Sequence, residues 1–173
     1  MSGCQTRSKA MGVLRKGRYS TPYADYFVTV CARRPTLTLS DHAVTKACLA
    51  ELRVIEQITA VTVRCAVIMP DHLHLLLTLG PATTLSNVIR IFKGRLPPPL
   101  RKFQATWQPS FYDHRVRSTE DRLPIFLYIF LNPYRRKLIP DNQSWPGFYC
   151  ASEDWTWFES LTNERCSQPA WLS

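Results

Sequence analysis

Several features that would direct an interpretation elsewhere are missing from this 173-residue chain. No apolar run approaches the roughly 20 residues that a membrane-spanning helix needs. The N-terminus is polar and basic and lacks the apolar segment of a signal peptide. The six cysteines contain no C-x-x-C pair, and no internal repeat is present. We therefore expect a cytoplasmic protein with reduced, mostly buried thiols and no membrane partner.

Acidic residues are also scarce. The chain has 13 Asp and Glu against 22 Lys and Arg, which gives a formal net charge of +9. A basic excess of this size favours a polyanionic partner, most simply nucleic acid. A role in solubility explains it less well, because acidic residues serve solubility better. An apolar content of 45% and a charged content of 20% are typical of one soluble globular domain.

Strand-like and helix-like segments alternate along the chain. Residues 26–32 are rich in β-branched and aromatic residues and predict a first strand. Apolar residues at helical spacing predict a helix from Ser40 or Asp41 to about residue 60. Residues 61–67 and 72–79 predict two strands joined by a turn at Pro70 and Asp71.

The second half of the chain repeats the alternation. It predicts a helix that begins at Thr84 or Ser86, a strand at 107–116 and a last helix from Ser118 or Thr119 to about residue 137. The order β-α-β-β-α-β-α predicts an α+β fold, a ferredoxin-like split βαβ antiparallel sheet with an extra C-terminal helix. We expect a basic N-terminal arm at 1–22, the domain at 23–140 and a Trp-rich tail of little periodicity at 141–173.

A wholly apolar run is interrupted at Pro70 and Asp71 and then continues with His72-Leu73-His74. Side chains alternate along a strand, so His72 and His74 point to the same face. Two imidazoles on one face can bind a metal ion. An isolated pair of this kind is more often two polar residues on a solvated face, so the rest of the chain has to supply the partners.

The last predicted helix contains a hydroxyl and an amide within an otherwise apolar run. Tyr128 and Asn132 are four residues apart and share one helix face. Each also has an ordinary explanation, because a buried tyrosine usually only forms a hydrogen bond and Asn-Pro often ends a helix. Pro124 should kink the helix unless it lies in the first turn.

These motifs together resemble the single-tyrosine HUH transposases, the IS200-like group, and within them the REP-associated tyrosine transposases. The resemblance covers about residues 18 to 138. It includes the segments 26–30, 69–74, 107–114 and 128–133, that is, YFVTV, MPDHLH, WQPSFYDH and YIFLNP. The ordered set is far more specific than a single His-x-His.

The resemblance implies a DNA-cleaving activity with assigned residues. By analogy, Tyr128 attacks a backbone phosphate and forms a 5′-phosphotyrosine link. His72, His74 and Asn132 would hold a divalent ion, Mg²⁺ or Mn²⁺. The implied partner is single-stranded or hairpin DNA of the REP type, and the protein would be a monomer or a homodimer. The alternatives are a replication-initiator nickase and a non-catalytic nucleic-acid-binding protein derived from a transposase.

Basic residues distributed along the chain are the candidate DNA contacts. Each alone is more often a solvated surface charge, but together they predict salt-dependent binding to DNA. They are Arg15, Lys16, Arg18, Arg90, Lys93, Arg95, Arg115, Arg117, Arg135 and Arg136. Aromatic residues of the tail could stack on unpaired bases, although packing on the core is the favoured role. Asp71 is interpreted as a turn residue and His114 as a polar strand residue.

Overall fold

The computed structural model describes residues 19–33, 38–95, 100, 103 and 105–161. Arg15, Lys16 and Arg18 of the predicted basic arm lie outside this part of the chain. The described elements are β1 (Asp25–Arg33), η1 (Thr38–Ser40), α1 (His42–Thr59), β2 (Thr62–Ile68), β3 (His72–Thr78), α2 (Leu85–Arg95), β4 (Thr106–Trp107), β5 (Tyr112–Arg115), α4 (Leu123–Arg135), β6 (Phe148–Cys150) and α5 (Ser152–Leu161).

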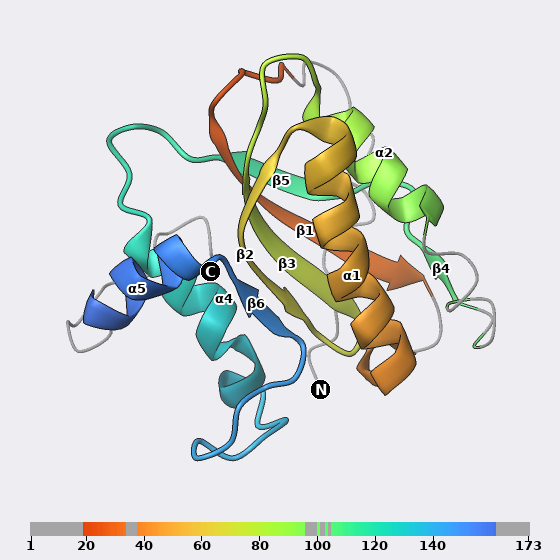
Figure 1. Ribbon diagram of the computed structural model, residues 1–173. Coiled ribbons are helices and arrows are strands. Elements are labelled where there is room, and N and C mark those ends of the chain that lie inside the picture. The colour runs from red at the N-terminus through yellow and green to blue at the C-terminus, as the bar shows by residue number, and fades with distance from the viewer. Residues whose placement is uncertain (1–18, 34–37, 96–99, 101–102, 104, 162–173) are drawn as a thin grey trace.

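The strands form one antiparallel sheet with the order β4-β1-β3-β2-β6, and β5 also pairs with β1. β1 and β2 run parallel with the antiparallel strand β3 between them, which is the split βαβ arrangement. Figure 1 shows α1 and α2 together on one side of this sheet and α4 and α5 on the other. The predicted α+β, ferredoxin-like fold with an added C-terminal helix is confirmed.

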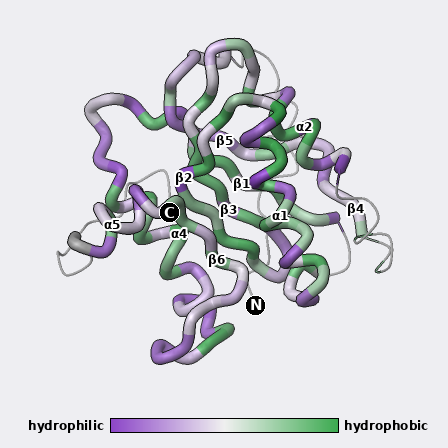
Figure 2. Tube along the Cα trace, in the orientation of Figure 1, coloured by the Kyte–Doolittle hydropathy of each residue, from purple (hydrophilic) through white to green (hydrophobic). Residues whose placement is uncertain are grey.

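Alternation along the strands divides the core into two layers. In β3, Leu73, Leu75 and Leu77 belong to the cluster packed under α1 and α2, while Leu76 belongs to the cluster under α4 and α5. The central strands are buried on both sides and run through the hydrophobic centre of the molecule in Figure 2. His72 and His74 share the side of Leu76, and therefore face α4.

The layer under α1 and α2 follows the expected sequence signals. Asp41 is the N-cap of α1, and its carboxylate accepts hydrogen bonds from the backbone N–H groups of Ala43 and Val44 at 3.0 and 3.2 Å. At the start of α2, the Thr84 hydroxyl accepts a hydrogen bond from the Asn87 N–H at 3.2 Å. Asp41 and Thr84 are thus the correct members of the two predicted pairs of capping residues.

Helix α4 begins at Leu123, so the predicted start at Ser118 or Thr119 is wrong. The Asp121 carboxylate accepts a hydrogen bond from the Leu123 N–H at 2.9 Å and marks the true beginning. Pro124 lies in the first turn, where the missing N–H is harmless. The helix also continues through Pro133 to Arg135, so Asn132 does not end it.

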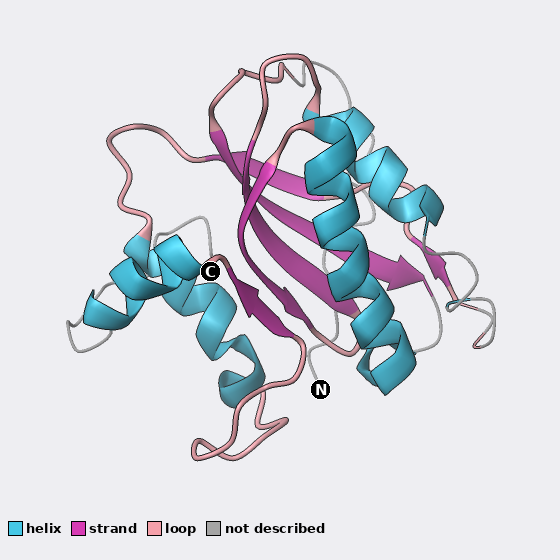
Figure 3. Cartoon of the chain, viewed as in Figure 1, coloured by secondary structure: helices cyan, strands magenta, loops and turns pink. Residues whose placement is uncertain are grey.

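The predicted strand at 107–116 is two short strands, β4 and β5, that pair with successive parts of β1. The tail also has more structure than its sequence pattern indicated. β6 adds to the sheet beside β2, and Phe158 of α5 is fully buried. Most aromatic residues of the tail therefore pack on the core, which is the role that the sequence favoured over base stacking. Figure 3 shows helix α5 beside α4.

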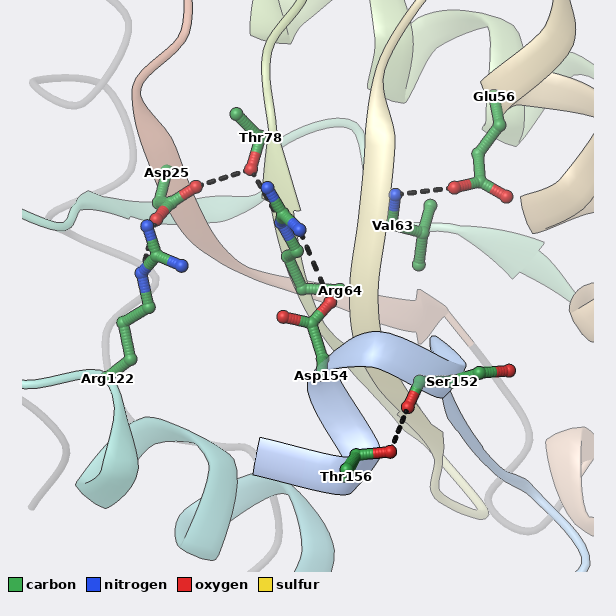
Figure 4. Close-up of polar contacts among 9 residues, drawn as sticks. All are labelled: Asp25, Glu56, Val63, Arg64, Thr78, Arg122, Ser152, Asp154 and Thr156. Carbon is green, nitrogen blue, oxygen red and sulfur yellow. Dashed lines mark hydrogen bonds and ion pairs between the residues drawn. The ribbon is translucent and has the colours of Figure 1, made fainter. Parts of the chain in front are cut away.

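A polar network fastens α4 and α5 to the sheet (Figure 4). Arg64 of β2 lies 3.5 Å from the Asp154 carboxylate of α5 and donates to the Thr78 hydroxyl at 3.0 Å. Thr78 in turn donates to Asp25, whose carboxylate lies 2.8 Å from the Arg122 guanidinium at the start of α4.

Among the described residues, no helix has the length and apolarity needed to span a membrane.

Candidate active site

The two histidines of β3 converge on one point. The Nε2 atoms of His72 and His74 are 3.0 Å apart, and the side chains are almost fully buried. His72 lies opposite Cys31 and His74 opposite Thr29 in the antiparallel register with β1. The predicted placement on one face is therefore confirmed, but this face is covered by α4 rather than solvated.

The outer nitrogen of each imidazole is held by a neighbouring side chain. His72 Nδ1 lies 2.6 Å from Asp71 Oδ1, and His74 Nδ1 lies 2.9 Å from Thr29 Oγ1. Arg136 reaches the same Asp71 oxygen at 3.4 Å. When Nδ1–H donates to these oxygens, each Nε2 keeps its lone pair. This is the arrangement that orients histidine ligands around a metal.

The charge states of the site fit that arrangement. Burial, aided by the charges of His72 and Arg136, holds the pKa of His74 well below its usual range, so its imidazole is neutral at physiological pH. The hydrogen bond from His72 is the main cause that lowers the pKa of Asp71, and its carboxylate is therefore ionised. A neutral imidazole is the form that binds a metal.

The spacing of the two nitrogens also fits a divalent ion. Adjacent ligands of an octahedral ion meet it at right angles about 2.1 Å away, which places them about 3.0 Å from each other. The His72 and His74 Nε2 atoms have that separation. In the described part of the chain, no group of three or more His, Cys, Asp or Glu side chains could hold a metal. A third ligand from the described part of the chain would therefore be another kind of side chain, such as the Asn132 amide.

Tyr128 lies beside the histidines. Its ring centroid is 5.0 Å from that of His74, and Phe27 contacts both rings at 5.4 Å from His74 and 5.8 Å from Tyr128. Tyr128 is only partly buried, in contrast to the two histidines. A phenol at the border of a buried imidazole pair and solvent can meet a substrate that approaches from outside.

Asn132 lies between two contacts that join α4 to the histidine face. Tyr128, Asn132 and Arg136 are spaced four residues apart and form one stripe on and just beyond α4. The first contacts the His74 ring and the last contacts Asp71. Asn132 is buried at 7% exposure between them. Asn132 therefore shares the helix face that contacts the histidine site.

Comparison with known proteins agrees with the motifs. The family described as "Transposase IS200 like" matches residues 22–121, more than half of the chain. The chain belongs to this family.

A member of the REP-associated group is among the proteins similar to this chain. The REP-associated tyrosine transposase of Escherichia coli K12 is 28% identical over 81 residues, which are 46% of this chain and 48% of that protein. The match thus spans about half the length of this curated relative. The resemblance found in the motifs is confirmed by these matches.

Two solved structures are also similar to this chain. One, of a REP-associated tyrosine transposase bound to a REP hairpin, superposes with a TM-score of 0.65 at 23% identity and covers 76% of this chain and 79% of that chain. The second, a putative transposase from Deinococcus radiodurans, has a TM-score of 0.48 at 24% identity and covers 66% and 95% of the respective chains. The first supports the fold described above.

The candidate DNA-binding cations that lie in the described part of the chain do not form one patch. Arg136 lies at the histidine site, and Arg135 beside it is exposed. Arg115 and Arg117 line a groove near the start of β1. The remaining described residues lie on α2, across the sheet from α4: Arg90 bonds Asn87, Lys93 donates to the carbonyls of Gln108 and Ser110, and Arg95 pairs with Glu51.

Two side chains at this site were not assigned to it from sequence. The Pro70-Asp71 pair predicts a turn residue at Asp71, and the signal for its second role is its position directly before His72. Thr29 carries no signal of its own, because its contact with His74 depends on the register between β1 and β3. His114 lies on β5 as expected, with Nε2 2.8 Å from the Glu120 carboxylate.

Proposed function

We propose that this transposase is a metal-dependent single-stranded DNA endonuclease and strand transferase with Tyr128 as its nucleophile. The observation that carries the proposal is the pair of converging Nε2 atoms, 3.0 Å apart, directly beside the Tyr128 ring. A buried structural pair would not need a partly exposed tyrosine and a buried amide on the helix that covers it.

The chain's own residues have distinct roles in this proposal. The Tyr128 hydroxyl loses its proton as its oxygen bonds to the scissile phosphorus. The bond from phosphorus to the 3′-oxygen breaks, and that oxygen takes a proton and leaves as a 3′-hydroxyl. The resulting 5′-phosphotyrosine retains the energy of the phosphodiester, so a 3′-hydroxyl can attack it and rejoin a strand without ATP.

His72, His74 and Asn132 would hold the ion, and Asp71 and Thr29 orient the imidazoles. A phenol has a pKa of about 10 and is a weak nucleophile at neutral pH. Bound Mg²⁺ or Mn²⁺ would polarise the phosphate and stabilise the charge that develops on it. Two imidazoles and one amide leave coordination positions for phosphate oxygens, unlike a closed structural site.

The substrate we propose is hairpin DNA of the REP type with unpaired flanks. The net charge of +9 fits a polyanion, and the similar solved structure is of a transposase bound to a REP hairpin. We further propose that the protein acts in the cytoplasm as a monomer or homodimer and that residues 23–140 carry the activity.

A covalent-adduct assay tests the nucleophile. The protein is mixed with labelled hairpin DNA carrying single-stranded flanks and Mn²⁺, and products are separated on a denaturing gel. We expect an adduct that disappears in Tyr128→Phe and on addition of a chelator, because the phenolate oxygen and the ion are both required. The matched control is Tyr134→Phe on the same helix. This change removes a hydroxyl that donates to the Gln143 carbonyl and is not part of the proposed site.

The outcomes separate the competing interpretations. An adduct that persists in Tyr128→Phe would reject this nucleophile. Binding of hairpin DNA without an adduct would favour a non-catalytic DNA-binding protein. Cleavage and rejoining that require a replication origin rather than a hairpin would favour the replication-initiator nickase.

A further inference from the structure

Tyr23, just before β1, has a strained backbone and an exposed ring. Its φ is 61°, in the left-handed region that residues other than glycine rarely adopt, and 73% of its surface is exposed. Such a conformation costs about 1–3 kcal/mol in a non-glycine residue. Because the ring is outside the core, glycine would be the cheaper residue for folding. Local folding therefore does not favour a tyrosine at this position.

The segment around Tyr23 is held firmly. The Tyr23 N–H donates to the Leu79 carbonyl at 2.9 Å, and the Leu79 N–H donates to the Ala24 carbonyl at 3.0 Å. The hydroxyl of the buried Tyr26 accepts from the Thr21 N–H at 2.9 Å. The preceding residue, Ser20, accepts from the first N–H of α2 at 2.9 Å. The exposed ring is therefore carried by an anchored backbone, which lowers the entropy lost on binding.

Tyr23 lines a groove of about 690 Å³ with Arg115 and Arg117. Arg115 donates to the neutral hydroxyl of Thr21 at 2.9 Å, so this contact does not offset its charge. Arg117 has a side chain that is 72% exposed and lies 4.0 Å from Glu120. The carboxylate of Asp25 in the groove is balanced by Arg122 at 2.8 Å. An aromatic ring beside cations is a surface suited to a base and its phosphates.

The groove opens near the catalytic side of the sheet. Asp25 and Thr29 point to the same face of β1, and Thr29 contacts His74. They are four residues apart on the strand, or about 13 Å. A short stretch of unpaired DNA can therefore contact the groove and still reach the histidine site.

We propose that Tyr23, together with Arg115 and Arg117, binds an unpaired nucleotide of the DNA strand, with the base stacked on the Tyr23 ring and the phosphates on the arginines. Bases inside a duplex are already stacked on each other, so this subsite favours single strands over duplexes. The inference rests on the proposed function for its choice of DNA as the ligand.

Binding of a labelled oligothymidine tests the subsite, because stacking does not depend on sequence. Fluorescence anisotropy is measured with chelator present, for that strand and for the same strand annealed to its complement. We expect Tyr23→Gly to weaken single-strand binding about tenfold, leave duplex binding unchanged and maintain or raise the melting temperature by relieving the strain. Tyr23→Trp should retain single-strand binding.

The arginines are tested in the same way. Arg117→Ala should weaken binding and reduce its salt dependence, whereas Arg53→Ala, an exposed cation on α1 across the sheet, should do neither. Unchanged single-strand affinity in Tyr23→Gly, or equal losses on strand and duplex, would overturn the subsite. If the covalent adduct still forms, that result leaves the proposed function intact. A wild-type protein that neither binds the strand nor forms an adduct would overturn both proposals.

Discussion

The two faces of β3 differ in character: one packs apolar side chains into the core, and the other carries the two histidines. On one face, leucines pack under α1 and α2, and the buried hydroxyls of Thr45 and Thr59 bond to the backbone carbonyls of Leu39 and Ile55. On the other face, buried polar side chains are directed at one another: His72 Nε2 lies 3.0 Å from His74 Nε2, and His72 Nδ1 contacts Asp71. The buried hydroxyls of the first layer only satisfy backbone acceptors, whereas the two imidazoles of the second converge on one point with their partners, as a site requires.

Truncation of adjacent residues on the two faces gives the largest expected contrast. Leu75→Ala should lower the free energy of unfolding by about 2–5 kcal/mol, because it removes a buried side chain and leaves a cavity, while folded molecules still form the DNA adduct. His74→Ala should abolish the adduct with a smaller loss of stability. Urea denaturation and the adduct assay, normalised to folded protein, measure both. Loss of adduct in folded Leu75→Ala would show that the faces are not independent.

The sequence predicts the layer under α1 and α2 better than the layer under α4 and α5. The α1 and α2 layer follows from periodicity and caps at Asp41 and Thr84. The alternation of β3 also places His72 and His74 together. Local sequence predicts the wrong start for α4, because Ser118 and Thr119 resemble capping residues, whereas Asp121 makes the contact with the Leu123 N–H.

The missed features depend on tertiary contacts. β6 has only three residues and forms because β2 offers an edge, and the Trp145 indole donates to the Ile68 carbonyl at 2.9 Å. Gly147 permits this close approach, because a Cβ there would lie 2.7 Å from the Ile68 oxygen. The Thr29 contact likewise exists only once β1 and β3 are in register. Local patterns carry no information about such pairings.

Substitution of Asp71 should have a smaller effect on the histidine site than substitution of His74. If its carboxylate orients His72, Asp71→Ala should weaken Mn²⁺ binding about 10–100-fold, the usual range for residues that support metal ligands. Isothermal titration calorimetry measures this affinity. Asp71→Asn keeps an acceptor oxygen and should lie between Ala and wild type. The matched control is Asp41→Asn in the other layer, where asparagine caps α1 equally well. Equal Mn²⁺ affinity in wild type and Asp71→Ala would contradict this role.

Protonation of His74 should give the smallest and most gradual effect. Burial lowers its pKa in the folded state, so on acidification the unfolded chain takes up the proton first. Stability from this group is therefore present above the ordinary histidine pKa of about 6.5 and is lost as pH falls below it, by up to about 1.4 kcal/mol per pH unit. Urea denaturation between neutral and mildly acidic pH, with chelator present, measures the slope. His74→Gln should flatten it, whereas His42→Gln, an exposed residue of α1, should not. An identical slope in wild type and His74→Gln would mean that other groups, such as Asp71 at its own lower pKa, dominate the acid response of this face.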